Sequence, residues 1–386
     1  MQAFAFNTTK SLLFRPGAAS ELGAVAGALL GPRVLAVTDK GLRRLGLPDT
    51  AFAALQAAGA AVEVFDAVEA DPSRATLEAA VAAGRALGAT GVLGFGGGSS
   101  MDVAKLAALL LGSGEDLDAA WGVGNAQGPR LPLVLIPTTA GTGSEVTPVS
   151  IITVGEEEKR GVSSTVILPD LAVLDPDLTL GLPPAITAAT GVDAMVHAIE
   201  AYASASPNNN PLSRMLAREA LRLLGANIEQ AVFEGGDRDA RGAMLLGSML
   251  AGQAFANSPV AAVHALAYPV GGIFHVPHGL SNALVLPHVL RFNAPSAGAV
   301  YAEIAADAFP DLAAVEGSQA RCAAFIEALA DLSKRLGMQT RLREVGIPED
   351  ALPRMAADAM KQTRLLVNNP REVTEADALA IYRAAW

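Results

Sequence analysis

The fold class is decided by residues 91–111, which read GVLGFGGGSSMDVAKLAALLL. Residues 91–95 form a short apolar run typical of a buried strand, three glycines and two serines follow, and residues 101–111 have helical spacing. A strand that leads through glycines into a helix offers backbone N–H groups and a helix N-terminus to a phosphate. A tight turn that needs positive φ would use the same glycines, so this loop alone leaves both interpretations open.

Strands and helices alternate on both sides of this stretch. Further strands are expected at 33–38, 61–65 and 133–136, and helical spacing is found at 40–58 and 74–87. This alternation predicts a mostly parallel sheet with helices on both faces.

The character of the sequence changes after the Gly-Leu-Pro-Pro segment at 181–184. Helical patterns then follow one another at 185–204, 211–233, 238–256 and 260–268, with several more before the C-terminus. We therefore expect an α/β dinucleotide-binding domain over 1–182 and an all-helical domain over 183–386, facing each other across a cleft.

A second polar loop follows the strand expected at 133–136. Its hydroxyl side chains, which lie among glycines, are Thr138, Thr139, Thr142 and Ser144. Hydroxyls and glycines at the carboxyl ends of two strands are what a cofactor-binding crevice requires. Helix capping would explain one or two of these hydroxyls, but four less easily.

Asp39 ends the strand at 33–38 and has two interpretations. Its carboxylate can accept a hydrogen bond from the adenine ribose 2′-hydroxyl, which would favour NAD over NADP, or it can cap the following helix. In the usual dinucleotide fingerprint the acidic residue follows the glycine loop by about 20 residues. Asp39 precedes the loop instead, so the connectivity must differ from the standard fingerprint.

Composition and charge exclude several classes of protein. The chain has 386 residues, 51% of them hydrophobic and 17% charged, which excludes a disordered chain. The net charge is −11 and the 28 Lys and Arg residues form no dense cluster, so nucleic acid is not an expected partner. A single cysteine, Cys322, and an N-terminus without a signal-peptide pattern favour a cytoplasmic protein.

Residues 242–290 contain no Asp, Glu, Lys or Arg. Prolines, glycines and amides interrupt the segment, so no clean apolar run of about 20 residues remains for a membrane span. We expect buried helices and loops that line an internal cleft, and no membrane partner.

Histidines and one aspartate form the candidate metal site. Asp193 and His197 are four residues apart, so on a helix both project from one face; an ordinary helix-surface pair has the same spacing. His264 and His278 lie in the charge-free segment, as core residues or as ligands. Buried imidazoles need partners and a divalent cation supplies one. Three imidazoles and a carboxylate suit Fe(II) or Zn(II), with an open position left for substrate.

Taken in order, these segments resemble the iron-containing (group III) alcohol dehydrogenase family nearly end to end. The matching motifs are FRPGA at 14–18, GGGS at 96–99 with Asp102 and Lys105, PTTAGTGSE at 137–145, Asp175-Pro176 with Leu178, ATGVD at 189–193, the two histidine segments, and Asn369-Pro370-Arg371. Their order and spacing together are highly specific.

The resemblance implies a dehydroquinate synthase-like fold, NAD as cofactor, and Fe(II) or Zn(II) as the metal. It implies Asp193, His197, His264 and His278 as the ligands. The residues it implies for NAD are Asp39, Gly97, Gly98, Ser99, Thr138, Thr139, Thr142, Thr147, Lys159 and Leu178, and to these we add Asp71 and Asp102.

Two positions depart from the family pattern. Many members have a histidine near the nicotinamide where this chain has Tyr268. We therefore expect His275 to be the better candidate for the proton relay, with Tyr268 as the second. Asp71-Pro72 stands where the family often has Asn-Pro, which alters a contact to the cofactor.

The expected activity is an NAD(H)-linked interconversion of small or medium primary alcohols and aldehydes, with the alcohol oxygen on the metal. The alternative is a hydroxyacid–oxoacid transhydrogenase that retains its NAD, a branch similar to this chain at Tyr268-Pro269. A sugar-cyclising lyase would need a basic, phosphate-gripping site, which 242–290 does not offer. Both cofactor loops and the complete ligand set argue against a non-catalytic binding module. The resemblance also implies a homodimer or a larger homo-oligomer.

Overall fold

The computed structural model describes residues 3–155 and 158–386, and the chain divides into two compact units. The α/β unit comprises Asn7–Thr139 and Gly143–Leu180. The helical unit comprises Gly181–Trp386, together with Ala140–Thr142 and a short segment ending at Phe6. This division lies close to the boundary expected near residue 182, but the sequence pattern does not indicate that the two short segments belong with the helices.

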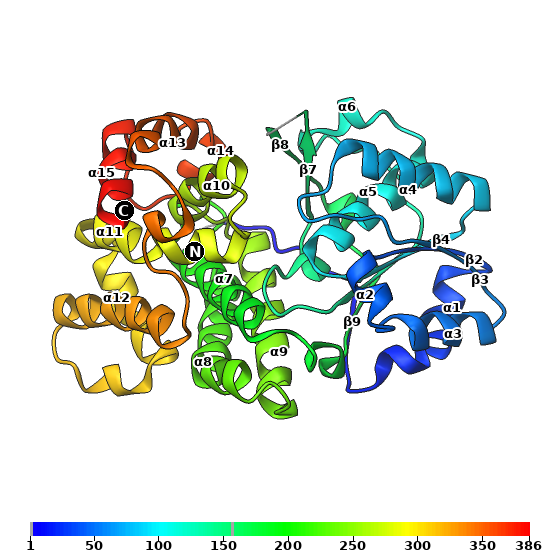
Figure 1. Ribbon diagram of the computed structural model, residues 1–386, viewed down its shortest axis with the longest axis horizontal. Coiled ribbons are helices and arrows are strands. Elements are labelled where there is room, and N and C mark those ends of the chain that lie inside the picture. Colours follow the sequence, from blue (N-terminus) through cyan, green and yellow to red (C-terminus); the bar gives the residue numbers. More distant parts are fainter. Residues whose placement is uncertain (1–2, 156–157) are drawn as a thin grey trace. The chain divides into compact units, whose positions relative to one another are not determined.

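A six-stranded parallel sheet forms the centre of the α/β unit (Figure 1). Its strands lie in the order β1 (Ser11–Phe14), β9 (Leu171–Leu174), β6 (Leu133–Pro137), β4 (Gly91–Gly96), β2 (Arg33–Val37) and β3 (Ala61–Phe65). A smaller sheet contains β5 (Gly122–Val123), β8 (Glu158–Ser163) and β7 (Val149–Val154). The parallel sheet is as predicted, whereas β1, β9 and the strands of the small sheet are not predicted from the sequence. β1, β5 and β9 are short and β8 is polar, but β7 is a six-residue, mostly apolar strand.

Helices cover both faces of the parallel sheet, as the alternating pattern predicts (Figure 1). Successive side chains of a strand point to opposite faces. Leu35 of β2 therefore packs in one core with α4 (Arg74–Leu87) and α5 (Gly98–Ser113). Its neighbour Val34 packs in a second core with α1 (Leu22–Leu30) and α3 (Asp49–Ala57). The two remaining short helices are α2 (Lys40–Arg44) and α6 (Leu117–Ala120).

The helical spacing at 40–58 predicts one continuous helix, and this prediction is wrong. The structure has two helices there, α2 and α3, with a turn between them. Gly46 adopts a φ of 66°, which favours glycine, and Pro48 directly precedes α3. The apolar periodicity continues across the turn because α3 packs against the same face of the sheet.

The helical unit consists of helices and short turns in the part of the chain that the structure describes. Its helices are α7 (Pro184–Ala203), α8 (Pro211–Phe233), α9 (Arg238–Asn257), α10 (Ala262–Phe274), α11 (His278–Ala308), α12 (Ser318–Arg335), α13 (Leu352–Ala359), α14 (Thr363–Leu366) and α15 (Glu375–Ala385). The predicted spans of α7, α8 and α9 match closely. The prediction that a helix ends at residue 268 is wrong, because α10 continues through Pro269 to Phe274. Pro269 is fully packed, and packing offsets the missing backbone hydrogen bond.

α7 is the central helix of this unit and carries two of the predicted ligands. Its residues from Gly191 to Tyr202 are all buried, because α8, α9 and α11 pack around it (Figure 1). An unbroken buried run that includes Asp193 and His197 requires partners for these polar side chains. Elsewhere in the unit, Cys322 of α12 is buried, and burial raises the pKa of its thiol.

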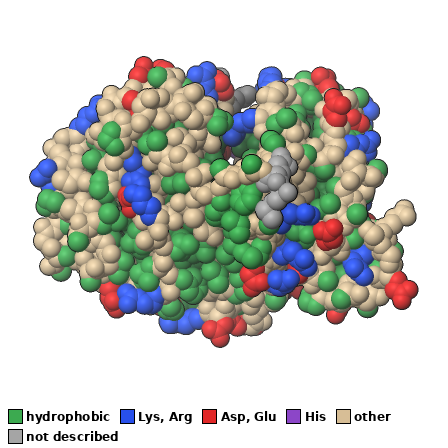
Figure 2. Space-filling view, turned by 180° about the vertical axis from the view of Figure 1, so that it is seen from behind, with side chains coloured by type: hydrophobic (Ala, Val, Ile, Leu, Met, Phe, Trp, Pro, Cys, Tyr) green, Lys and Arg blue, Asp and Glu red, His purple; other side chains and the backbone are tan. Residues whose placement is uncertain are grey.

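The surface carries mixed charges. On the face shown in Figure 2, Lys and Arg side chains lie in small groups among acidic and apolar ones, with no broad basic patch among the residues coloured there. None of the helices within 3–155 and 158–386 combines the length and the apolar character that a membrane span requires.

Candidate active site

The four metal ligands predicted from the sequence lie together in the helical unit. Asp193 and His197 lie on α7, His264 lies in the first turn of α10, and His278 is the first residue of α11. One possible ligand atom from each residue lies within 4.8 Å of the others. The two ligand pairs are far apart in sequence, and the packing of α10 and α11 against α7 brings them together.

Two glycines permit the close approach that this cluster needs. A Cβ at Gly279 would lie 2.3 Å from the Ala189 carbonyl oxygen of α7, so only glycine lets the start of α11 reach α7. A Cβ at Gly141 would lie 2.7 Å from the Cβ of Thr190. Gly141 belongs to the short segment that the helical unit incorporates.

Hydrogen bonds fix which ring nitrogen of two histidines faces the cluster. Nδ1 of His197 lies 3.2 Å from the Gly141 carbonyl oxygen, and Nδ1 of His264 lies 2.6 Å from Oε2 of Glu200. A carbonyl and a carboxylate accept hydrogen bonds, so each Nδ1 carries the proton. Each Nε2 is then unprotonated and can bind a metal ion.

The remaining contacts fit a divalent cation. Nε2 of His264 is buried without a hydrogen-bond partner among the described residues, and lies 3.9 Å from Oδ1 of Asp193. Nε2 of His278 lies 3.8 Å from the same oxygen, and Asn282 donates a hydrogen bond of 2.6 Å to it. Three imidazole nitrogens and one carboxylate are a donor set that Fe(II) and Zn(II) bind, so the residues fit the implied metal.

The charge states of the cluster also suit a metal. Burial lowers the pKa of His197 to about 3, so its imidazole is neutral at pH 7. For Asp193, burial favours the neutral form, but the three nearby imidazoles and the Asn282 hydrogen bond outweigh it and lower the pKa overall. A neutral imidazole and an ionised carboxylate are the forms that bind metal ions.

The two predicted proton-relay residues lie in different surroundings. The Tyr268 ring is half-buried, with its centroid 6.2 Å from that of the His278 ring. His275 ends α10 with a φ of 55° and is exposed. On the other side of the cluster, the ring of Phe255 stacks on His197 at 4.4 Å. Tyr268 is therefore the relay candidate that the structure places beside a ligand.

In the α/β unit, the predicted cofactor loops follow three adjacent strands. Gly97 is the N-cap of α5, and the helix begins at Gly98 with Ser99 in its first turn. The Thr138 N–H donates to the Gly96 carbonyl oxygen at 3.0 Å, which ties the ends of β6 and β4 together. Asp39 follows β2 and caps α2 by accepting from the Leu42 N–H at 2.9 Å. Of the two interpretations of Asp39, the structure therefore shows helix capping, which uses one carboxylate oxygen.

The other predicted cofactor residues are distributed over both units. Asp71 and Lys159 pair with each other at 2.6 Å, and Lys159 also donates to Thr153. Leu178 is buried in the core beneath the sheet. Thr139 lies beside Gly97, since a Cβ there would meet its Oγ1 at 3.7 Å. Thr142, by contrast, is grouped with the helical unit.

A buried lysine that the sequence pattern left without a role organises the second loop. Nζ of Lys105 is wholly buried and donates to Ser144 Oγ at 2.7 Å, to the Val149 carbonyl oxygen at 2.8 Å and to Thr147 Oγ1 at 3.2 Å. Burial lowers its pKa to about 8. Asp102 accepts from Ser144 and from the Ile151 N–H, so both of its oxygens already have protein donors. These contacts hold the loop against α5.

Two further polar residues around the metal cluster escape the sequence pattern. Glu200 lies three residues after His197 on the same face of α7, and Asn282 lies one turn after His278. Helical spacing could have placed both beside the ligands. Carboxylates and amides at such positions are also ordinary surface residues, so spacing alone does not single them out.

The fold and the site together define a protein of two units, with a glycine-rich loop before a helix in one and a cluster of four possible metal ligands in the other. Residues 9–176 match the family model described as iron-containing alcohol dehydrogenase. Residues 187–386 match the model of the C-terminal part of the same family. The chain belongs to the iron-containing alcohol dehydrogenase family and is an oxidoreductase.

Individual relatives agree with this assignment. The chain is 42% identical over 378 residues to long-chain-alcohol dehydrogenase 1 of Geobacillus thermodenitrificans. The alignment covers 96% of this chain and 93% of that protein. A crystal structure of a 1,3-propanediol oxidoreductase is similar, with a TM-score of 0.95, 36% identity and full coverage of both chains. A sulfoacetaldehyde reductase from Bifidobacterium kashiwanohense in complex with NAD⁺ has a TM-score of 0.87 at 29% identity, covering 100% of this chain and 99% of that one.

Proposed function

We propose that the protein interconverts small or medium primary alcohols and aldehydes, with NAD(H) as the hydride carrier and a divalent metal at the four-residue cluster. The observation that carries this proposal is the buried Nε2 of His264, which has no hydrogen-bond partner among the described residues and lies 3.9 Å from Oδ1 of Asp193 within the ligand set. Such a nitrogen is costly in a protein interior unless it binds something.

The chain's own residues hold and orient both groups. The bound metal supplies Lewis-acid polarisation of the substrate oxygen, and the nicotinamide supplies or accepts the hydride. Glu200 and the Gly141 carbonyl orient two of the imidazoles. The absence of charged residues from 242–290 keeps the surroundings of the cluster poorly solvated, which strengthens electrostatic interactions there. Tyr268 is the candidate that passes a proton between the substrate oxygen and solvent, with His275 as the second candidate.

The proposed NAD-binding residues are those implied by the resemblance, with Asp71 and Asp102 added. The glycine loop at Gly97 and Gly98 supports phosphate binding, because it presents the N-terminus of the long helix α5. The remaining members of the set are Asp39, Asp71, Ser99, Asp102, Thr138, Thr139, Thr142, Thr147, Lys159 and Leu178. Asp39 keeps one oxygen for the ribose, since capping uses the other. Asp102 and Lys105 act by positioning the loop.

Uncharged substrates suit this site better than hydroxy acids. A carboxylate or sulfonate substrate needs a cation or several donors, and residues 242–290 supply no Lys or Arg. Fe(II) is the proposed metal, Zn(II) being the alternative that the same donor set binds. Cytoplasmic location and assembly as a homodimer or larger oligomer remain part of the proposal.

The test is anaerobic NADH consumption by chelator-stripped protein with a panel of aldehydes and oxo acids, before and after addition of Fe(II) or Zn(II). We expect metal-restored reduction of uncharged aldehydes. The His264→Ala variant should show none, whereas His288→Gln, outside the cluster on α11, should retain it. If the metal-free His264→Ala variant reduced aldehydes at the rate of the wild type, the proposal would be refuted. Turnover of paired hydroxy and oxo acids without added NAD would favour the transhydrogenase.

A further inference from the structure

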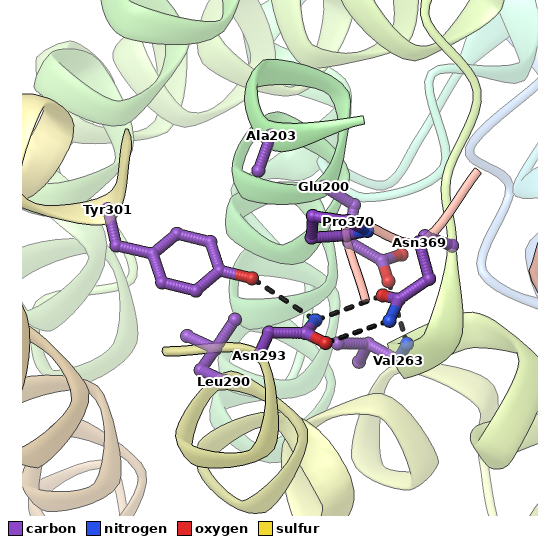
Figure 3. Close-up of a pocket in the computed structure, with 9 residues that line it drawn as sticks. Glu200, Ala203, Val263, Leu290, Asn293, Tyr301, Asn369 and Pro370 are labelled. Carbon is purple, nitrogen blue, oxygen red and sulfur yellow. Dashed lines mark hydrogen bonds between the residues drawn. The ribbon is translucent and has the colours of Figure 1, made fainter. Parts of the chain in front are cut away.

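The helical unit contains a small cavity whose lining includes Glu200, the residue that accepts a hydrogen bond from the proposed ligand His264 (Figure 3). Its polar lining consists of Glu200, Asn293, Tyr301 and Asn369. About 10 Å³ is open to the centre of a water molecule, which is roughly the room that one water needs. A cavity of this size whose lining includes several hydrogen-bonding groups can hold one buried water.

The two amides of the lining satisfy each other. Asn293 donates to Oδ1 of Asn369 at 2.9 Å, and Asn369 donates back to Oδ1 of Asn293 at 2.8 Å (Figure 3). The second hydrogen of the Asn293 amide goes to Tyr301 Oη at 3.2 Å, and that of Asn369 goes to the Arg371 carbonyl oxygen at 2.6 Å. The amide hydrogens are therefore all used, and none remains for Glu200.

Within the described part of the chain, Tyr301 has an unused hydrogen-bond donor, and Glu200 can accept a further hydrogen bond. In the hydrogen bonds that the structure describes, the Tyr301 hydroxyl accepts from Asn293, and its own hydrogen has no acceptor. Burial raises the pKa of Tyr301, so the hydroxyl keeps that hydrogen. Glu200 accepts from Val263 N–H and from His264 Nδ1, one donor for each oxygen, and a carboxylate can accept more. A water between them would accept from Tyr301 and donate to Glu200.

We propose that one water occupies this cavity and links the Tyr301 hydroxyl to Glu200, which makes Tyr301 a positioning residue for the metal ligand His264. Glu200 held in this way keeps the proton of His264 on Nδ1 and turns Nε2 toward the metal. Partners of metal-bound histidines typically change metal affinity by about 10- to 100-fold when they are removed. The inference rests on the proposed metal site.

The first test is the equilibrium affinity of the intact protein for Zn(II), measured by competition with a chromophoric chelator. Glu200→Gln should weaken binding about 10- to 100-fold, because its amide presents a donor to Nδ1 and favours the wrong tautomer. Tyr301→Phe, which removes only the hydroxyl, should weaken it by a smaller factor, about three- to tenfold. The matched control is Tyr382→Phe, another fully buried tyrosine, whose hydroxyl donates to the Leu266 carbonyl oxygen. It should bind Zn(II) as the wild type does.

The double variant separates a linked role from a merely structural one. If Tyr301 acts through Glu200, then Glu200→Gln with Tyr301→Phe should bind Zn(II) no more weakly than Glu200→Gln alone. The proposal would be overturned if the double variant lost Zn(II) affinity by the product of the two single-variant factors. An unchanged Zn(II) affinity in Tyr301→Phe would overturn it as well.

A crystal structure of the wild-type protein tests the water directly, even if a variant fails to fold. It should show one water within hydrogen-bond distance of Tyr301 Oη and Glu200, and a dry cavity would overturn the proposal. If the wild type bound no metal at all while this water was present, the proposed function would fail and the water site would stand without its role in metal binding.

Discussion

Asp71 and Lys159 both belong to the proposed cofactor set, yet they form an ion pair with each other. The carboxylate of Asp71 is 61% exposed, so the pair contributes little to stability, about 0.2–1 kcal/mol. It does neutralise the lysine that is proposed to reach the cofactor. A free Lys159 would attract the pyrophosphate more strongly.

We therefore expect Asp71→Asn to tighten NAD binding by about two- to fivefold, as an exposed pair of that strength allows. Isothermal titration with NAD measures the effect. Glu78→Gln removes the same charge from an exposed position on α4 and should leave the affinity unchanged. Weaker binding in Asp71→Asn would mean that the carboxylate itself contacts the cofactor.

Glu145 gives the stability of the protein a pH dependence. Burial raises its pKa to about 7 from an ordinary 4.5. Between these values the folded protein holds a proton that the unfolded chain has released, so the stabilising contribution is full below pH 4.5 and is lost as the pH rises through 7.

The Glu145→Gln variant should lack this pH-dependent contribution to the free energy of unfolding. Urea midpoints recorded from pH 5 to pH 8 should fall more steeply for the wild type than for the variant. Glu78→Gln again serves as the control and should follow the wild type. Parallel curves for the wild type and Glu145→Gln would show that Glu145 binds no extra proton on folding.

At the scale of elements, the metal cluster depends on how closely α11 starts beside α7. Gly279→Ala places a Cβ 2.3 Å from the Ala189 carbonyl oxygen, so α11 must shift and carry His278 with it. We expect a loss of about 1–3 kcal/mol in the free energy of unfolding and at least about a tenfold weaker metal affinity.

Chelator competition and urea unfolding measure these two losses. Gly272→Ala in α10 is the matched control, because an added Cβ there meets nothing within 4 Å. Alanine is the better helix former, so this variant should be as stable as the wild type or more so by up to about 1 kcal/mol. Normal metal affinity in Gly279→Ala would show that α11 tolerates the shift.

The sequence predicts the elements that repeat a strong pattern and misses those that depend on partners. β2, β3, β4 and β6 are mostly apolar runs, and apolar residues recur at helical spacing along the whole of α8 and α9. The predicted spans of these elements are therefore close to the structure. β8 is a polar strand that pairs with β7, and α10 continues past a proline because its surroundings are packed. Such features follow from tertiary contacts that no local pattern contains.

The same limit holds at the site. Asp193, His197, His264 and His278 could be singled out because the chain has only five histidines. His264 and His278 lie in the charge-free segment 242–290, and His197 has helical spacing from Asp193. Glu200, Asn282 and Lys105 are common residue types, and only the folded chain shows what they contact.

For the whole molecule, the proposed metal ligands lie in the helical unit and most of the proposed NAD-binding residues lie in the α/β unit, so each ligand should mainly stabilise one unit. At 100 times its dissociation constant, a ligand adds about 2.7 kcal/mol to the stability of the unit that binds it. Amide hydrogen exchange should show that Zn(II) slows exchange in α7, α10 and the start of α11. NAD should slow it around the N-terminus of α5.

Protein stripped of both ligands provides the baseline, and a Zn(II) titration of the His264→Ala variant is the control. That variant should gain no protection in the helical unit and should respond to NAD as the wild type does. Zn(II) protection around α5 in place of α7 would contradict the assignment of the metal to the helical unit.

The buried Cys322 has a practical consequence for spectroscopy. It is the only cysteine of the chain, it is 3% exposed, and its raised pKa keeps it in the unreactive thiol form. Thiol reagents should therefore leave the native protein unlabelled. Cysteines introduced at two exposed positions, Met215 on α8 and Val123 on β5, would give one dye site in each unit. Energy transfer between such dyes would then report any change in the distance between the two positions during turnover, in an otherwise natural chain.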